Sequence, residues 1–185
     1  MDAAAALEKI FADPRYQKNL DWGEPRSGHP EGTIRAHLAQ LEANLARLEA
    51  KLSPQETAKL RLLIHTHDTF KPEAKADAAI VDPRSHASLA RAFLAEYCSD
   101  EDLLAMVQYH DEPYALWRQL QSKGAYNHGR LAALVNRIRD WDLFLAFLIV
   151  DGCTPGKSRQ PLHWLFGELR GQVASRFTQD DILDY

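Results

Sequence analysis

An adjacent histidine and aspartate, His67 and Asp68, follow the apolar run Leu62–Ile64, and Lys71 comes three residues after the aspartate. At a helix end, consecutive side chains diverge by about a sixth to a quarter of a turn, so an imidazole and a carboxylate can reach one metal ion while the spare carboxylate oxygen reaches a second. The pair alone is weak evidence, because the chain has eight histidines and 26 acidic residues. The hypothesis of a metal site therefore needs partners from elsewhere in the chain.

Further histidines and one aspartate continue the apolar face of a predicted helix, which surface residues need not do. These are His37, His86, His110 and Asp151. Taken alone, His37 could equally be a core histidine with one satisfied nitrogen. Asp151 extends a helical apolar series that runs from Leu131 to Leu148, and an unpaired carboxylate in such a position is costly. The aspartate therefore requires a metal, a cation or exposure to solvent.

The elements that must position these side chains are all predicted helices. Apolar residues recur at three- and four-residue spacing in every periodic segment, and the sequence Ser53-Pro54-Gln55-Glu56 predicts a capped helix start. The predicted helices cover residues 3–12, 32–52, 53–71, 85–97, 100–112, 114–122, 128–151 and 161–177. Long loops at 19–31, 72–85 and 152–160 would supply the walls of a pocket, and the acidic C-terminal tail is expected to fray. The predicted fold class is all-α.

Composition indicates an ordinary globular protein. The 185 residues suit one domain, and a net charge of −4 argues against an extended nucleic-acid surface. Cys98 and Cys153 are too few for a disulfide framework, which favours a reducing compartment. No secretory signal or membrane-spanning run is present, so we expect a cytoplasmic protein that is not bound to membranes. The sequence says nothing of oligomeric state.

The ordered set H…HD…H…H…D, with the local sequence His67-Asp68-Thr69-Phe70-Lys71, resembles the HD-domain superfamily of metal-dependent phosphohydrolases in its two-metal form. The segment His86–Ala90 resembles the small-residue helix of that family, which begins with histidine. The segment Gly28–Thr33 resembles the start of the HD domain of bacterial CCA-adding enzymes. The resemblance covers about residues 28–155 and implies a single compact multi-helix bundle over 1–185, completed by a C-terminal packing helix over 161–177.

By this resemblance, one metal would be held by His37, His67, Asp68 and Asp151, and Asp68 would bridge to a second metal held by His86 and His110. Histidine-rich ligands favour divalent transition metals, namely iron, manganese, cobalt, nickel or zinc. Two such ions against two carboxylates leave a net positive pocket that attracts phosphate.

Other residues are candidates for contacts with the substrate. Lys71 could contact a substrate phosphate or stabilise the leaving group, or it could be a solvated lysine at a helix end. Glu31 and His29 could orient a metal water and line the entrance, or brace their loop. Lys157 could face the same pocket as Asp151.

Several further motifs are weaker candidates. The segment from Asp151 to Ser158 resembles a phosphate-binding P-loop, but aspartate stands where that motif requires glycine, and the preceding series has helical phasing. Asp111 is expected to be an outer partner of His110 or a proton acceptor. His65 is expected to be structural, and His128 and His163 are expected at the surface or at helix ends.

The resemblance implies a phosphohydrolase or phosphodiesterase that acts on a nucleotide or another small phosphate ester through a metal-activated hydroxide. The alternative is a mixed-valence di-iron oxygenase of the myo-inositol oxygenase-like type, because both kinds of enzyme use the same ligands and keep the lysine after the His-Asp pair. A third hypothesis is a non-catalytic, metal-stabilised binding module. The ligand set does not distinguish hydrolysis from oxygen chemistry.

Overall fold

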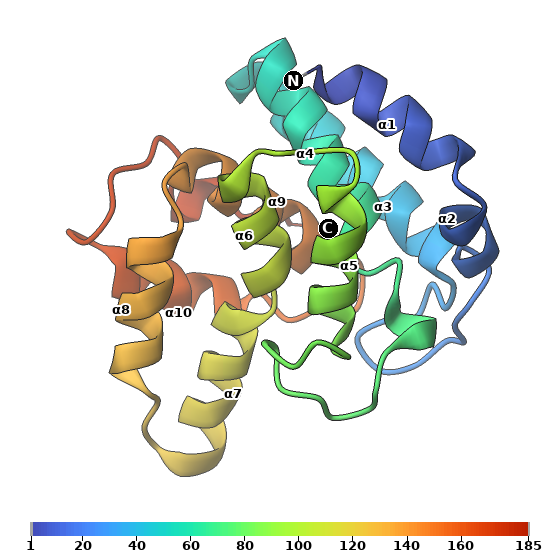
Figure 1. The fold of residues 1–185 in the computed structure, drawn as a ribbon. Coiled ribbons are helices and arrows are strands. Elements are labelled where there is room, and N and C mark those ends of the chain that lie inside the picture. The colour runs from blue at the N-terminus through green and yellow to red at the C-terminus, as the bar shows by residue number, and fades with distance from the viewer. Residues whose placement is uncertain (1, 185) are drawn as a thin grey trace.

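The computed structural model describes residues 2–184, and this part of the chain is an all-α bundle without β-strands (Figure 1). The prediction of an all-α fold is therefore confirmed. The α-helices are α1 (Ala3–Ala12), α2 (Pro14–Asn19), α3 (Ile34–Leu48), α4 (Pro54–Thr66), α5 (His86–Ala95), α6 (Glu101–Tyr109), α7 (Glu112–Lys123), α8 (His128–Arg137), α9 (Trp141–Gly152) and α10 (Gln160–Leu169). Short 3₁₀ helices are η1 (Glu49–Lys51), η2 (Lys71–Glu73) and η3 (Gln179–Asp181).

Helix α9 lies at the centre of the bundle. Its residues 143–150 are all buried, so it is apolar around its whole circumference rather than along one stripe. Helices α3 and α4 pack against it, and α1 covers the other side of α4. In Figure 1, α1 and α2 lie at one end of the molecule and α7 and α8 at the other. Two of the helices next to the clustered histidines, α3 and α4, thus pack directly on this central helix.

Capping side chains mark where several helices start. The Ser53 hydroxyl accepts from the Glu56 N–H while the Glu56 carboxylate accepts from the Ser53 N–H, which is the predicted capping box. Ser85 caps α5, Asp100 caps α6 and Asn127 caps α8. These caps fix where the helices that hold the histidines begin.

The long helix predicted over 128–151 is wrong, because the chain leaves the helical conformation at Ile138 and starts again at Trp141. The Asp102 carboxylate, from α6, accepts the N–H groups of Arg139 and Asp140 at 2.8 Å each. Asp140 then caps α9 by accepting from the Leu143 N–H. A distant carboxylate therefore satisfies the backbone groups that a break exposes.

Other boundaries also differ from prediction. Helix α2 begins directly after α1, because Asp13 ends the first helix and caps the second, with Pro14 at its first position. Pro113 lies in the first turn of α7 and does not simply end α6. The helix predicted over 32–52 is α-helical only to Leu48, and 3₁₀ geometry follows.

The C-terminal segment also departs from expectation. The helix predicted over 161–177 ends at Leu169. The acidic tail does not fray: Ile182 and Leu183 are buried, and the carbonyl of Leu183 accepts from Arg159. No described helix has the length and apolar character needed to cross a membrane.

Candidate metal centre

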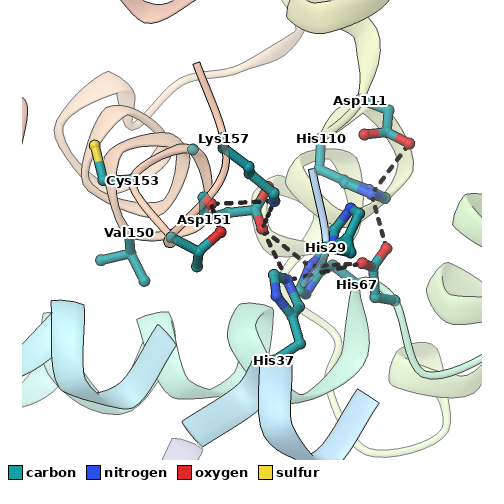
Figure 2. A network of polar contacts seen from close by, with 12 residues as sticks. His29, His37, His67, His110, Asp111, Val150, Asp151, Cys153 and Lys157 are labelled. Atoms are coloured by element: carbon teal, nitrogen blue, oxygen red, sulfur yellow. Dashed lines mark hydrogen bonds and ion pairs between the residues drawn. The ribbon is translucent and has the colours of Figure 1, made fainter. Parts of the chain in front are cut away.

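The residues of the H…HD…H…H…D pattern come together from five helices. His37 lies on α3, His67 and Asp68 directly follow α4, and His86 is the first residue of α5. His110 directly follows α6, and Asp151 lies in the last turn of α9. Figure 2 shows the side chains of His37, His67, His110 and Asp151 gathered around one space. The segments are up to 114 residues apart in the chain.

The Asp68 carboxylate divides this cluster into two groups. Its Oδ2 atom lies 3.4 Å from His67 Nε2 and 4.0 Å from His37 Nε2. Its Oδ1 atom lies 3.7 Å from His86 Nε2 and 3.6 Å from His110 Nε2. Each carboxylate oxygen therefore faces a different pair of imidazoles, which is the arrangement that a bridging ligand requires.

Asp151 completes the first group. Its Oδ1 atom lies 3.0 Å from His37 Nε2 and 3.8 Å from His67 Nε2. The buried Asn44 side chain on α3 donates to the carbonyl of Val150 at 2.8 Å, and this bond holds the end of α9 that carries Asp151 against α3. The carboxylate that extends the apolar series of α9 thus faces the cluster rather than the core.

Backbone carbonyls hold the Nδ1 atoms of His67 and His110, so the Nε2 atoms of both rings face the cluster. The Nδ1 atom of His67 lies 2.9 Å from the Ile64 carbonyl, and that of His110 lies 2.7 Å from the Val107 carbonyl. A carbonyl only accepts, so Nδ1 carries a proton in both rings, and in the neutral form of each ring the Nε2 lone pair points into the cluster. This is the tautomer expected of a histidine that ligates a metal through Nε2.

The donor set fits a metal ion. His67 Nε2 is buried and has no hydrogen-bond partner among the described residues, a situation that is costly unless a cation occupies the position. Three triads have ligand atoms within 4.8 Å of one another: His37-His67-Asp68 and Asp68-His86-His110 within the cluster, and His29-Glu31-His37 beside it. Imidazole and carboxylate together suit the divalent transition metals. These buried histidine and aspartate groups could therefore hold a metal ion, and the arrangement is compatible with an HD-like fold.

The electrostatics keep the carboxylates ionised. Burial by itself raises the pKa of Asp68, but the charge of Lys71 and contacts with the neighbouring imidazoles hold that pKa well below its ordinary value. Burial also raises the pKa of Asp151, and Lys157 and His37 outweigh it, so this pKa too lies well below the ordinary value. Burial lowers the pKa of His67 and favours the neutral ring. Ionised carboxylates and neutral imidazoles are the protonation states that metal binding needs.

Two lysines neutralise the two aspartates. Lys71 forms an ion pair with Asp68, and Lys157 lies 2.8 Å from Asp151 Oδ1. Each side chain remains about a fifth exposed, so both ammonium groups stand at the edge of the cluster. Lys157, expected from the sequence to face the same pocket as Asp151, thus contacts that aspartate directly.

Glu31 contacts the cluster from the loop before α3. Its Oε1 atom lies 2.9 Å from His37 Nδ1 and 2.9 Å from His29 Nδ1, and its side chain is almost fully buried. The contact with His37 lacks hydrogen-bond geometry, so Glu31 acts on that ring through its charge, which favours a proton on Nδ1 and leaves Nε2 as the ligand atom. Of the two roles considered from the sequence, the contact favours bracing over direct contact with substrate.

The loops that carry Glu31 and Lys157 touch each other. Gly156, with a φ of 83°, lies so close to Pro30 that a Cβ atom at Gly156 would approach the proline Cδ to 2.9 Å. Only glycine combines this backbone conformation with this close approach. The two loops therefore pack together beside His37 and Asp151.

Asp111 lies closer to the cluster than the sequence indicated. Its Oδ2 atom is 3.2 Å from His86 Nε2 and 3.6 Å from His110 Nε2, and Figure 2 shows it beyond His110. Burial lowers the pKa of His110, but Asp111 and Asp68 raise it to about 9 overall. Its position directly after His110 was the available signal, and the turn between α6 and α7 brings it back to the ligand atoms.

The remaining histidines lie outside the cluster. The Nδ1 atom of His65 lies 2.7 Å from Tyr16 Oη, and its Nε2 atom lies 3.2 Å from Glu42 Oε1. These two hydrogen bonds agree with the predicted structural role. His128 begins α8 and His163 is exposed on α10, as expected. The segment that resembled a P-loop follows a helix rather than a strand, so the phosphate-loop hypothesis is wrong.

Comparisons with known proteins give no relative. No family model matches the sequence, no curated protein is detectably similar, and no solved structure matches the fold. The geometry of the site therefore has to carry the functional argument.

Proposed function

We propose that this protein is a metal-dependent phosphohydrolase of the HD-domain type, which hydrolyses a small phosphate ester, such as a nucleotide, at a two-metal centre. One observation carries the proposal: the two oxygens of Asp68 face two separate pairs of imidazoles. When bound, two divalent ions would lower the pKa of a shared water and screen the charge on the phosphate oxygens.

The residues of the chain have distinct roles in this proposal. His37, His67 and Asp151 would hold one ion, His86 and His110 the other, and Asp68 would bridge them. The carbonyls of Ile64 and Val107 keep the rings of His67 and His110 in the ligating tautomer.

Lys71 and Lys157 would bind the phosphate. Each is paired with a carboxylate of the cluster and is partly exposed. Once Asp68 and Asp151 are neutralised by ligation, each ammonium can turn toward a phosphate oxygen and stabilise its charge. The positive edge of the site would then meet the anionic part of the substrate.

Asp68→Asn tests the proposal. This change keeps the shape of the side chain and removes the charge that would bridge the ions. We expect hydrolysis of phosphomonoesters and phosphodiesters by wild-type protein supplied with manganese, cobalt, nickel, zinc or iron(II). We expect Asp68→Asn to abolish hydrolysis and to reduce bound metal, measured by elemental analysis, while circular dichroism stays unchanged.

The control is Asp21→Asn, which removes an exposed carboxylate paired with Arg35. Full metal content in Asp68→Asn would refute the assigned site. Hydrolysis absent with every metal, together with two irons and a mixed-valence spin signal, would refute the hydrolase proposal in favour of the di-iron oxygenase.

A further inference from the structure

A cavity of about 670 Å³ adjoins the metal-centre candidate. Its walls come from the segment 78–81 and from helices α7 and α8, and the segment joining α4 to α5 lies near α7 in Figure 1. His86 and Asp111 belong both to this cavity and to the cluster, because Asp111 Oδ2 lies 3.2 Å from His86 Nε2. A molecule in the cavity would therefore reach the group formed by Asp68, His86 and His110. Its volume is typical of small-molecule sites, which are about 300–1,000 Å³.

Apolar side chains form most of the cavity. Ile80 and Val81 line it from the segment before α5, and Ala133 and Leu134 line it from α8. Val81 is 63% exposed, which is unusual for a large aliphatic side chain in this protein. A wall of this kind favours an apolar ligand surface over a polyhydroxylated one, because sugar hydroxyls would lose water without gaining partners.

The polar groups of the cavity are mostly occupied. Arg130 is held by Glu112 through two contacts of 2.6 Å, and the Ser85 hydroxyl donates to the Ile80 carbonyl. Arg137 differs, because within residues 2–184 it has no carboxylate partner and its guanidinium lies 5.2 Å from the centre of the Tyr109 ring. A planar cation against an aromatic ring offers a flat surface on which a third planar group can stack.

We propose that this cavity binds a planar aromatic group that the substrate carries next to its phosphate, with the ring stacked on the pair Tyr109 and Arg137. The inference rests on the proposed function for the position of the phosphate, at the metal centre beside His86. Two kinds of substrate carry such an aromatic group: a nucleotide, through its nucleobase, and a simple aryl phosphate ester.

Ala133→Trp, compared with Ala132→Trp, tests the proposal. Both alanines are exposed on α8, but only Ala133 lines the cavity, so only the first indole would fill it. Binding is measured by isothermal titration calorimetry on the intact protein loaded with manganese. The probes are the four common nucleoside 5′-monophosphates, phenyl phosphate, ribose 5-phosphate and inorganic phosphate.

We expect at least one aromatic phosphate to bind about tenfold or more tightly than ribose 5-phosphate, a difference of about 1.4 kcal/mol. Ala133→Trp should remove this preference and leave the affinity for inorganic phosphate unchanged, whereas Ala132→Trp should keep both. Arg137→Gln should weaken the aromatic probes selectively. A preference for nucleotides over phenyl phosphate would identify a nucleobase, and equal binding would identify any aryl group.

Equal affinity for ribose 5-phosphate and every aromatic probe would overturn the proposal, as would no binding of any probe or an unaltered preference in Ala133→Trp. These results are distinct from failure of the proposed function. If no probe is hydrolysed with any metal but the aromatic preference persists, the hydrolase proposal fails and the cavity assignment stands. If hydrolysis occurs without an aromatic preference, only the cavity assignment fails.

Discussion

Replacing Glu31 by glutamine separates the roles of the two halves of the cluster. The Glu31 carboxylate lies 2.9 Å from Nδ1 of both His37 and His29. Burial raises the pKa of Glu31, but the hydrogen bond with His29 and the neighbouring His37 lower it overall, so the group is ionised. Glu31→Gln keeps the size of the side chain and removes the negative charge that favours a proton on His37 Nδ1. The ring of His37 would then be a weaker and less well oriented ligand.

The expected loss follows from this contact. Removing a carboxylate that orients a ligating histidine typically weakens metal affinity by about 10- to 100-fold, or about 1.4–2.8 kcal/mol. The effect should be confined to the ion held by His37, His67 and Asp151. The other group is oriented separately, because His110 Nδ1 donates to the Val107 carbonyl at 2.7 Å.

A competition titration with a metal-binding dye measures both sites. Glu24→Gln is the matched control, since Glu24 is an exposed acid of the same loop. We expect one affinity to fall in Glu31→Gln, the other to stay, and both to stay in Glu24→Gln. Wild-type affinity at both sites in Glu31→Gln would show that Glu31 does not orient His37, and an equal loss at both would show a general disturbance of the fold.

Two further predictions concern stability. Asp102→Ala leaves the N–H groups of Arg139 and Asp140 without their acceptor, so the free energy of unfolding, measured by urea denaturation, should fall by about 2–3 kcal/mol. Glu101→Ala, at the exposed neighbouring position, should change it little, and equal losses in the two variants would contradict the assignment. Burial raises the pKa of Glu42, but His65 and Arg61 lower it overall. Ionised Glu42 therefore stabilises the folded protein above the unfolded-state pKa of about 4.3, and this stabilisation is lost as the pH falls through the pKa of Glu42 in the folded state. The urea midpoint of Glu42→Gln should therefore fall less than that of wild type between about pH 6 and 3, and parallel curves would refute this.

Local sequence determined much of what could be predicted. The predicted cap at Ser53 acts within three residues of itself, so its effect is readable from the sequence. The phasing of His37 and Asp151 with apolar neighbours likewise indicated an inward position, because a helix fixes which residues share a face. The structure brings both side chains to the same cluster, 3.0 Å apart.

Long-range contacts account for what could not be predicted. The break between α8 and α9 depends on Asp102, which is 37 residues before Arg139 and carries no local sign of this role. The buried tail depends on Arg159, whose side chain meets the Leu183 carbonyl 24 residues away. The apolar phasing of 128–151 is continuous across the break, so the pattern alone predicted one helix.

The contact between Gly156 and Pro30 has a consequence for access to the metal centre. Pro30 is followed by Glu31, which contacts His37, and Gly156 is followed by Lys157, which contacts Asp151. Each residue of the contact is therefore adjacent to a side chain that touches the first group of ligands. The two loops therefore form one continuous wall beside the first group of ligands. On the other side, His86 and the half-exposed Asp111 line the cavity that Ala133 also lines, so a ligand in that cavity contacts the second group of ligands without displacing this wall.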